Sequence, residues 1–545
     1  MNLRRNMLIP AAALVLLVSS CNYLDVSDQL AGGLQNTDEV FENVSYTKRW
    51  YASIFTGIPD YSGLNSTNVN GFKNPWASIC DELVTGYGNA SKYNNSDKNA
   101  TNVSFHRYGD CYKAIRQANI FLQKAHVITA GGTQGDELLE PELKRYQANA
   151  RFMRAFYHYL LFEQYGPIII VGDKVYEATE SQDMSRNSVD EVVEYLDKEL
   201  LASADELSQE PIIDENYRAE PTKGVALAVR AKMWVYAASP LLNGGFNEAL
   251  NIANPDGKKL FPIADAAKWE RARQACADFI NYANENNRYE LYYAAPEKNG
   301  VVNPEKSVYE LFQKYTKEII WATATADWGG LDGDAFDRRI VPRTEQNGLG
   351  STGVTQELVD AFYMNDGLPI RGTTYLPASP QYTEEGMSTY TETNVDPIKG
   401  GKEYTPVNVS NRFINREARF YNTVFFNGRQ WPVTCNTIQF YNGGNAGQQN
   451  GQYTQTGYML FKRFNRRISK TSPGVSSRYR PSIIFRLADF YLLYAEAANE
   501  VNPNDPVVLE YLNKVRHRAG LTTKIEELNP VIKGNKELQR AAHPT

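Results

Sequence analysis

The sequence predicts a mainly α-helical protein: an α-solenoid of tetratricopeptide-like helical hairpins with a loop-rich inserted subdomain. Helical periodicity runs from Asp38 to about Ala283 and returns at 484–500 and 506–518. Between 286 and 480 the periodicity weakens, Gly, Asn, Thr and Tyr dominate, and turn dipeptides accumulate. Because no 34-residue period can be aligned, the solenoid is predicted from neighbouring helices of hairpin size and not from a repeat motif.

The individual helices are predicted from apolar residues spaced three and four apart. The clearest helix is 141–165, and Gly166-Pro167 ends it. Its apolar face consists of Ala148, Phe152, Ala155, Tyr159 and Phe162. A helix at 188–203 begins with a capping box of Ser188 and Glu191. Further helices are predicted at 38–57, 107–127, 222–238 and 265–284.

These patterns divide the chain into four segments. Residues 1–20 form a signal peptide, and 21–285 form an N-terminal helical scaffold with binding loops. Residues 286–480 form the loop-rich inserted subdomain, and 481–545 form a C-terminal helical scaffold. Long irregular loops usually carry function, so the insert is expected to contribute to a site.

The first 21 residues predict export on a lipid tether. Arg4 and Arg5 precede the apolar run Met7 to Val18, which is too short to span a bilayer. Small residues then lead to Cys21, as in a bacterial lipoprotein signal, where this cysteine becomes the lipid-modified first residue. The alternative is an ordinary secretory signal with an incidental cysteine. We expect a soluble body anchored through Cys21.

Composition excludes some classes of function. The 57 Lys and Arg against 63 Asp and Glu give a net charge of −6, which offers no basic field to nucleic acid. Only 5 His and 5 Cys, without a CxxC motif, argue against a metal enzyme, whereas 35 Tyr and 7 Trp supply many flat hydrogen-bonding rings. The cysteines after Cys21 allow three disulfide pairings, and buried thiols are the favoured alternative. They are Cys80, Cys111, Cys276 and Cys435.

Several segments together resemble a known family. They occur in the family's order: Cys21–Asp25, Arg154–Ile168, Pro221–Ala238, Arg419–Val424, Phe485–Ala497 and Leu512–Leu521. With the lipoprotein start, the chain resembles the SusD/RagB lipoproteins of glycan-degrading Gram-negative bacteria. The resemblance implies a helical scaffold with a loop-rich subdomain inserted on one face. It also implies a non-catalytic outer-membrane protein, facing the cell exterior, that passes oligosaccharides to a SusC-like TonB-dependent porin.

The C-terminal segment departs from the family's pattern. Family members usually continue after Arg-Ala-Gly-Leu into a Glu- and Arg-rich helix and then a Gly-x-Arg and Asp-Leu-x-Arg-Trp ending. Lys536–Arg540 resembles the start of that helix, and Ala541–Thr545 then breaks it. We therefore expect a truncated or frameshifted C-terminus, and the loss of that end would leave helical faces uncovered.

The expected ligand site consists of loop aromatics. Sugar rings present apolar C–H faces that stack on exposed aromatic rings, while amides and carboxylates bind their hydroxyls. Tyrosines within helical stripes are expected to pack in the core, as are Trp50 and Trp234. By position, the resemblance implies ring contacts from Trp76, Tyr87, Tyr292, Trp321 and Trp328. Hydroxyl contacts are expected from Asn89 and Asp327.

Catalysis and metal binding are not expected. Asp489 and Glu496 share a helix face roughly 10.5 Å apart along the axis, but their surroundings are apolar and pairing with Arg486 is favoured. No nucleophile or phosphate-loop motif is present. Four acids between Asp327 and Asp337 suggest calcium, but Phe336 breaks the EF-hand pattern and a solvated turn is favoured. No cofactor is therefore predicted, with a structural calcium as the alternative. Two rival functions remain: a peptide-capturing member of the family and a glycoside hydrolase.

Overall fold

The computed structural model describes most of the chain after residue 36. The described residues are 37–62, 80–85, 106–129, 136–176, 180, 184–297, 299–323, 328, 330–333, 335–392, 403–448, 453–470 and 477–541. Within these ranges every helix is too short or too polar to traverse a lipid bilayer.

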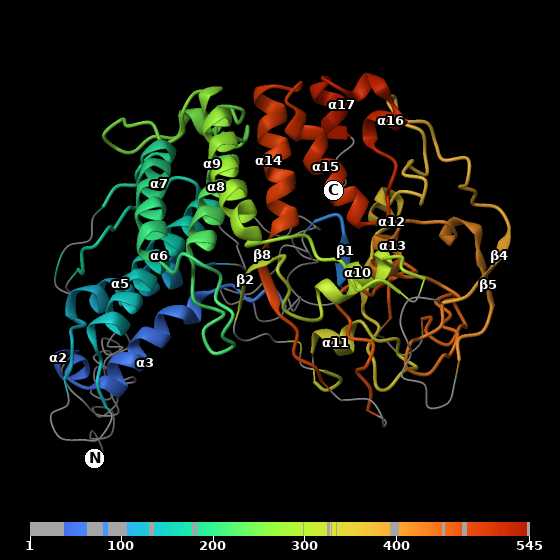
Figure 1. Cartoon of the computed structure of the whole chain (residues 1–545), viewed down its shortest axis with the longest axis horizontal. Coiled ribbons are helices and arrows are strands. Elements are labelled where there is room, and N and C mark those ends of the chain that lie inside the picture. Colours follow the sequence, from blue (N-terminus) through green and yellow to red (C-terminus); the bar gives the residue numbers. More distant parts are fainter. Residues whose placement is uncertain are drawn as a thin grey trace, which may run out of the picture.

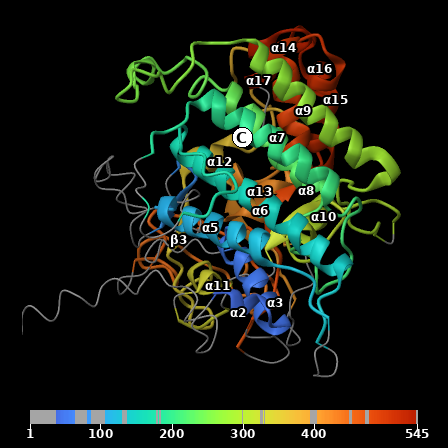
Figure 2. The same cartoon turned by 90° about the vertical axis from the view of Figure 1, so that its left-hand side faces the viewer.

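A stack of antiparallel helices forms the scaffold, and this confirms the predicted fold class. Helices that follow one another in the chain lie side by side, and α14 packs on α9 although the insert separates them (Figure 1). Figure 2 shows the stack from its α5–α9 side. The scaffold helices are α5 (Tyr108–Lys124), α6 (Glu140–Tyr165), α7 (Val189–Glu206), α8 (Lys223–Ala238), α9 (Ala267–Asn284), α14 (Leu487–Val501) and α15 (Pro506–Arg518).

Local capping explains where the helices begin and end. The predicted capping box is confirmed: the Ser188 N–H donates to Glu191 Oε2 at 2.8 Å, and the Glu191 N–H donates to Ser188 Oγ at 3.4 Å. Gly166 ends α6 with a φ of 65°, a conformation that favours glycine. The predicted helix 38–57 is split into α2 (Thr37–Phe41) and α3 (Val44–Ile54), because Asn43 caps the second.

The prediction of a helix over 484–500 was wrong at its start. Ser482–Arg486 form strand β8, which pairs antiparallel with β2 (Ile319–Thr323), so α14 begins only at Leu487. Apolar residues that belong to a buried strand cannot be told from helical ones by periodicity alone. The remaining strand pairs are β1 (Leu83–Thr85) with β3 (Thr352–Val354), β4 (Met387–Tyr390) with β5 (Val407–Ser410), and β6 (Val424–Phe425) with β7 (Met459–Leu460).

A second hydrophobic core organises the loop-rich region. It is rich in aromatic rings, among them Phe413, Phe420, Phe425, Phe426, Trp431 and Phe461. The buried ion pair between Arg429 and Glu392 crosses it, with two N–O distances of 2.8 Å. Short helices complete the fold: α10 (Pro304–Leu311), α11 (Phe336–Arg339), α12 (Gln356–Ala361), α13 (Ala418–Thr423), α16 (Ile525–Leu528) and α17 (Lys536–Ala541). Single 3₁₀ turns lie at Phe55–Gly57, Ala249–Asn251, Glu285–Asn287, Asn411–Phe413 and Pro530–Ile532.

The buried His158 makes scaffold stability depend on pH. Its Nδ1 contacts the Arg154 carbonyl oxygen at 2.8 Å, and its Nε2 accepts from the Val171 N–H at 3.4 Å, which fits a neutral ring. Burial lowers the pKa of His158 to about 4. Because this folded-state pKa lies below that of the unfolded chain, the stabilisation is complete above about pH 6.5 and is lost as the pH falls toward 4.

We therefore expect the lowered pKa of His158 to reduce the free energy of unfolding by about 3 kcal/mol when the pH falls from 7 to 4. Urea unfolding of the protein and of His158→Gln at each pH isolates this contribution, since glutamine does not titrate. If the free energy of unfolding fell equally in the two proteins between pH 7 and pH 4, His158 would not be the source of this pH dependence.

Candidate functional site

A small hydrophobic cluster joins the scaffold to the second core. This seam cluster consists of Leu311, Phe312, Ile319, Ala322 and Ile483, with Tyr292 and Tyr315 packed against it. The β2–β8 pair lies at the centre of Figure 1, between the helical stack and the loop-rich region. Ile319 and Ala322 of β2 face the seam cluster, while Ile320 and Trp321 belong to the scaffold core. The two strands therefore position side chains at the boundary of both parts.

Tyrosine and arginine side chains gather on the solvent side of this boundary. Tyr479 is 52% exposed, and its hydroxyl oxygen lies 3.2 Å from that of Tyr315. The Arg218 guanidinium lies 4.7 Å from the centroid of the Tyr315 ring, and its Nε donates to the Ile213 carbonyl at 3.0 Å. Burial raises the pKa of Tyr315, so its hydroxyl stays protonated at neutral pH. These three residues, Arg218, Tyr315 and Tyr479, are called the seam surface below.

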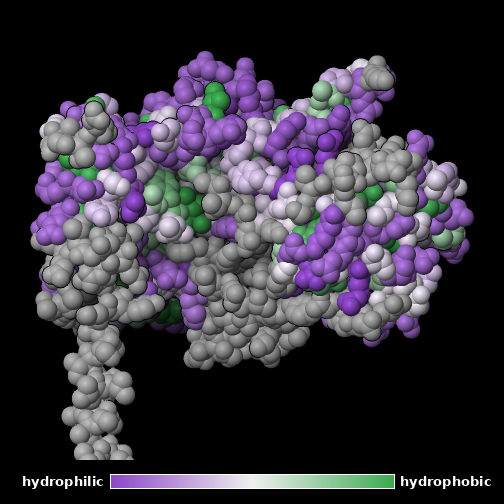
Figure 3. Space-filling model, turned by 90° about the horizontal axis from the view of Figure 1, so that it is seen from below, coloured by the Kyte–Doolittle hydropathy of each residue, from purple (hydrophilic) through white to green (hydrophobic). Residues whose placement is uncertain are grey.

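The seam surface offers an exposed ring and hydrogen-bonding groups beside a small cavity. The cavity has a volume of about 230 Å³ and is lined in part by Arg218, Tyr315 and Thr316. This is smaller than the usual pocket for a drug-sized ligand, at about 300–1,000 Å³. Seen from below, hydrophilic residues cover much of the described surface and hydrophobic ones occur in small groups (Figure 3). Recognition here would therefore rest on single rings and polar groups.

Tyr292 is the predicted site residue that the structure places at the seam cluster. Its ring is partly buried, its hydroxyl donates to Glu310, and Lys314 Nζ lies 5.1 Å from the ring centroid. Burial and the Glu310 hydrogen bond raise the pKa of Tyr292, which keeps the hydroxyl protonated. Its contact with a ligand stays a prediction.

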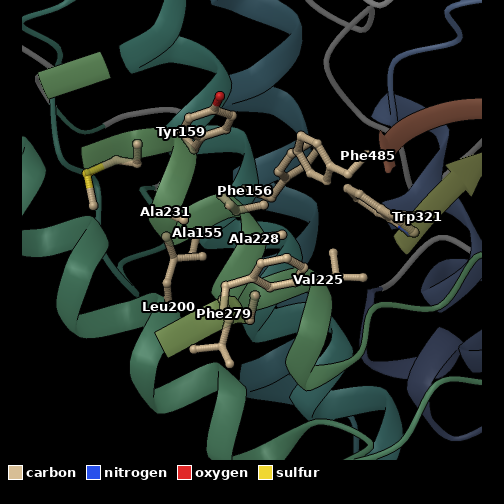
Figure 4. Close-up of a cluster of buried hydrophobic side chains, with 14 of the residues drawn as sticks. Ala155, Phe156, Tyr159, Leu200, Val225, Ala228, Ala231, Phe279, Trp321 and Phe485 are labelled. Carbon is tan, nitrogen blue, oxygen red and sulfur yellow. The ribbon is translucent and has the colours of Figure 1, made fainter. Parts of the chain in front are cut away.

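The prediction of Trp321 as an exposed stacking ring was wrong. The side chain is only 1% exposed and lies edge-on to Phe156, with ring centroids 4.9 Å apart. Figure 4 shows Trp321 beside Phe485 in the buried cluster, with Phe156 close by. Its Nε1 donates to the Ala219 carbonyl at 2.9 Å, so the indole fixes the loop that carries Arg218. The sequence showed an aromatic residue near turn-forming residues, but strand pairing turns it into the scaffold core.

Trp328 is likewise buried, at 1% exposure, and is not available for stacking. Its Nε1 donates to the Arg480 carbonyl at 2.7 Å, and the Arg480 guanidinium lies 4.4 Å from its ring centroid. Arg480 also makes a two-point ion pair with Asp337 at 2.9 and 2.6 Å. The sequence suggested that Asp337 belongs to a solvated turn with other acids. Instead, Asp337 is buried and paired with Arg480. Among the described residues no group of three or more His, Cys, Asp or Glu could hold a metal ion.

The other predicted residues have mixed outcomes. Trp76, Tyr87, Asn89, Asp327 and the lipidation residue Cys21 lie outside the described residues. As expected, Asp489 pairs with Arg486, at 3.2 Å. Cys111 and Cys276 are buried in α5 and α9, and burial raises the pKa of both thiols.

Sequence reasoning missed the seam surface. Tyr217-Arg218 lies in the loop before α8, and Tyr479-Arg480 is separated from β8 only by Pro481. Both are loop tyrosines beside an arginine, which is the signal that could have identified them. Residues 218, 315 and 479 are far apart in the sequence and meet only in the folded protein, where Tyr315 contacts both Tyr479 and Arg218.

Two family models match the chain. Residues 317–540 match the SusD family, and residues 52–235 match a family described as starch-binding and associating with the outer membrane. The second description supports outer-membrane association at the level of the family. No curated protein matches the chain.

Solved structures share the fold over most of the chain. BT4246 has a TM-score of 0.70 and 22% identity, covering 92% of this chain and 86% of that one. A SusD-like protein from Bacteroides fragilis has a TM-score of 0.62 and 19% identity, covering 94% and 85%. A SusD-like carbohydrate-binding protein, also from Bacteroides fragilis, has a TM-score of 0.61 and 15% identity, covering 93% and 85%. These solved structures show a common fold, and the two family matches, which together cover most of the chain, show that it belongs to the SusD/RagB family.

Proposed function

We propose that the protein is a glycan-binding lipoprotein of the cell surface that captures oligosaccharides and passes them to a SusC-like TonB-dependent transporter. Cys21 would carry the lipid that holds the protein to the outer membrane, facing the exterior. The single observation that carries the binding role is the seam surface, where an exposed Tyr479 ring adjoins a second phenol and a guanidinium. The family description of starch binding and outer-membrane association supports the ligand class and the location.

The chemistry of the seam surface suits a sugar. The exposed ring of Tyr479 can stack on the apolar C–H face of a pyranose, while the phenols and Arg218 can bind its hydroxyls. Stacking a ring on a flat partner is worth on the order of 1–3 kcal/mol in nucleic-acid binders, where the geometry is similar. The small volume of the cavity, about 230 Å³, supports recognition by such a surface platform over enclosure of an extended peptide.

The function is proposed to be binding without cleavage. A glycosidase needs two carboxyl groups about 5–9.5 Å apart on either side of one bond. Asp489, one of the two acids that the sequence places on one helix face, is paired with Arg486. Release of reducing sugar by the purified protein, abolished by one Asp or Glu substitution, would establish a hydrolase instead.

Tyr479→Ala is expected to weaken oligosaccharide binding by about 5- to 150-fold, the equivalent of one lost stacking contact. Isothermal titration with the glycans that the wild-type protein retains in affinity electrophoresis measures the effect. Tyr441→Ala is the matched control, because Tyr441 is 54% exposed and does not belong to the seam surface. Equal losses in the two variants, or none in Tyr479→Ala, would show that the seam surface is not the binding platform.

A further inference from the structure

A second cavity adjoins the segment that carries Tyr292. It has a volume of about 530 Å³ and is lined by residues of α15, of the loop after it and of α16, together with Tyr293. This volume lies within the range of about 300–1,000 Å³ that is usual for small-molecule sites. The cavity shares no lining residue with the cavity beside the seam surface. It is called the α15 cavity below.

The walls of the α15 cavity are held in place by buried hydrogen bonds. Glu318 is fully buried and accepts from the Tyr292 N–H at 2.8 Å and from Arg518 Nη1 at 2.7 Å, which ties the Tyr292 segment to α15. The Ile525 N–H donates to Asn513 Oδ1 at 3.0 Å, which ties α16 to the same helix. A ligand therefore meets a wall that is already ordered, and binding costs less conformational entropy.

An aromatic ring and an imidazole face the α15 cavity together. Tyr293 is 42% exposed, and its ring centroid lies 6.5 Å from that of His517, with 59° between the planes. The neighbouring Tyr292 packs against the seam cluster instead, so two consecutive side chains serve different surfaces. The buried Leu509 and Leu521 add apolar lining. A ring above an apolar lining suits the C–H face of a pyranose.

The polar groups of the lining suit hydroxyls better than they suit a charged ligand. Four lining side chains can both donate and accept a hydrogen bond, and none of them bonds to another residue in the described part of the chain. They are Tyr293, His517, Thr522 and Thr523. Sugar hydroxyls likewise donate and accept. Glu510 and Glu526 line the cavity together with its lysines, so no uniform positive charge selects an anion.

We infer that the α15 cavity is a second sugar-binding site, which takes a neutral sugar unit at a place separate from the seam surface. The inference goes beyond the proposed function and rests on it for the ligand class. Tyr293 stacks on the sugar ring, and the threonine hydroxyls and the imidazole bind its hydroxyls. Two sites on one protein retain a long glycan by avidity, because release from one site leaves the glycan held at the other.

Equilibrium dialysis with radiolabelled neutral trisaccharides tests the inference. Maltotriose, cellotriose, xylotriose and mannotriose are each measured with the purified protein. We expect two molecules of at least one trisaccharide to bind at saturation. Tyr293→Ala and Tyr479→Ala should each retain one of the two, and the double variant should retain neither. At its own site, Tyr293→Ala is expected to lower the affinity about 5- to 150-fold, the equivalent of one lost stacking contact.

Phe246→Ala is the matched control. Phe246 is 43% exposed, almost the same as Tyr293, and lies in the loop between α8 and α9. Both variants should keep the wild-type melting temperature, since both rings reach solvent. In affinity electrophoresis through a polysaccharide that the wild type retains, Tyr293→Ala should migrate faster than Phe246→Ala. His517→Ala provides a second variant, because it removes the imidazole and leaves the ring.

The outcomes separate this inference from the proposed function. A single bound trisaccharide that is lost in Tyr479→Ala and kept in Tyr293→Ala overturns the second site and leaves a glycan-binding protein. Loss of all binding in each single variant shows one continuous site and also overturns it. If no trisaccharide binds, equal migration of Tyr293→Ala and Phe246→Ala in the polysaccharide gel overturns it. If no glycan of any kind binds, the proposed function fails as well.

A peptide ligand is the remaining outcome that would contradict a sugar site. The cavity lining consists of helices and turns and lacks the strand edge to which many extended peptides bind. Tryptic peptides of casein are therefore expected not to bind. Peptide binding that is lost in Tyr293→Ala and kept in Phe246→Ala, without any effect on glycans, would assign the α15 cavity to peptide capture.

Discussion

Asp337→Asn is expected to lower the free energy of unfolding by about 3–5 kcal/mol, because it leaves the Arg480 guanidinium buried without its counter-charge. Both side chains are fully buried, and the pair is joined by two N–O contacts of 2.9 and 2.6 Å. Arg480 also contacts the Trp328 ring and the Arg463 carbonyl. The loss should therefore spread to the packing of the second core. Asparagine has nearly the same shape as aspartate, so the change measures charge and not volume.

Asp332→Asn is the control in the same segment. Asp332 is exposed and paired with Lys470 at 2.6 Å. An exposed pair contributes only about 0–1 kcal/mol. The urea midpoints of the two variants should therefore differ clearly, at equal slope. A shift in Asp337→Asn no larger than that in Asp332→Asn would show that the buried pair does not hold the second core together.

Trp321→Ala is expected to cost about 3–5 kcal/mol of unfolding free energy, the range for truncating a large buried aromatic side chain. The indole fills space between Phe156 and Phe485 in the scaffold core. Its removal also leaves the Ala219 carbonyl without a hydrogen bond. Thermal and urea unfolding followed by circular dichroism measure the loss.

Tyr479→Ala serves as the contrasting variant at the same boundary. Its side chain is half exposed, so its stability should change by no more than about 0.5 kcal/mol while its glycan affinity falls. A Trp321→Ala protein with wild-type stability and lost glycan binding would contradict the burial of Trp321 and would restore it as a ligand contact.

Much of the scaffold could be predicted because its signals are local. The apolar face of 141–165, the capping box at Ser188 and the Gly166 terminator lie within a few residues of the backbone they shape. Asn43 was the local signal overlooked, since its cap divides a run that periodicity alone joins. The predicted segment boundaries remain a prediction, although β1 from the N-terminal segment pairs with β3 in the insert.

For the candidate site, the sequence predicted the type of residue but not which residues are exposed. Aromatic residues on loops were expected, and Tyr292 does lie at the seam cluster. Trp321 and Trp328 could not be distinguished from exposed rings, because burial depends on segments far away in the chain. Trp321 packs on helix α6, and Trp328 donates to the carbonyl of Arg480.

By itself the sequence determined the helical class, most of the scaffold helices and the resemblance to SusD/RagB proteins, because these depend on spacing and on residues close together in the chain. Only the tertiary structure decided which rings and charges reach solvent. The pairing of β2 with β8 turns Trp321 inward, and tertiary packing brings the hydroxyls of Tyr315 and Tyr479 together. The physical reason is that exposure and electrostatics are properties of neighbours in space.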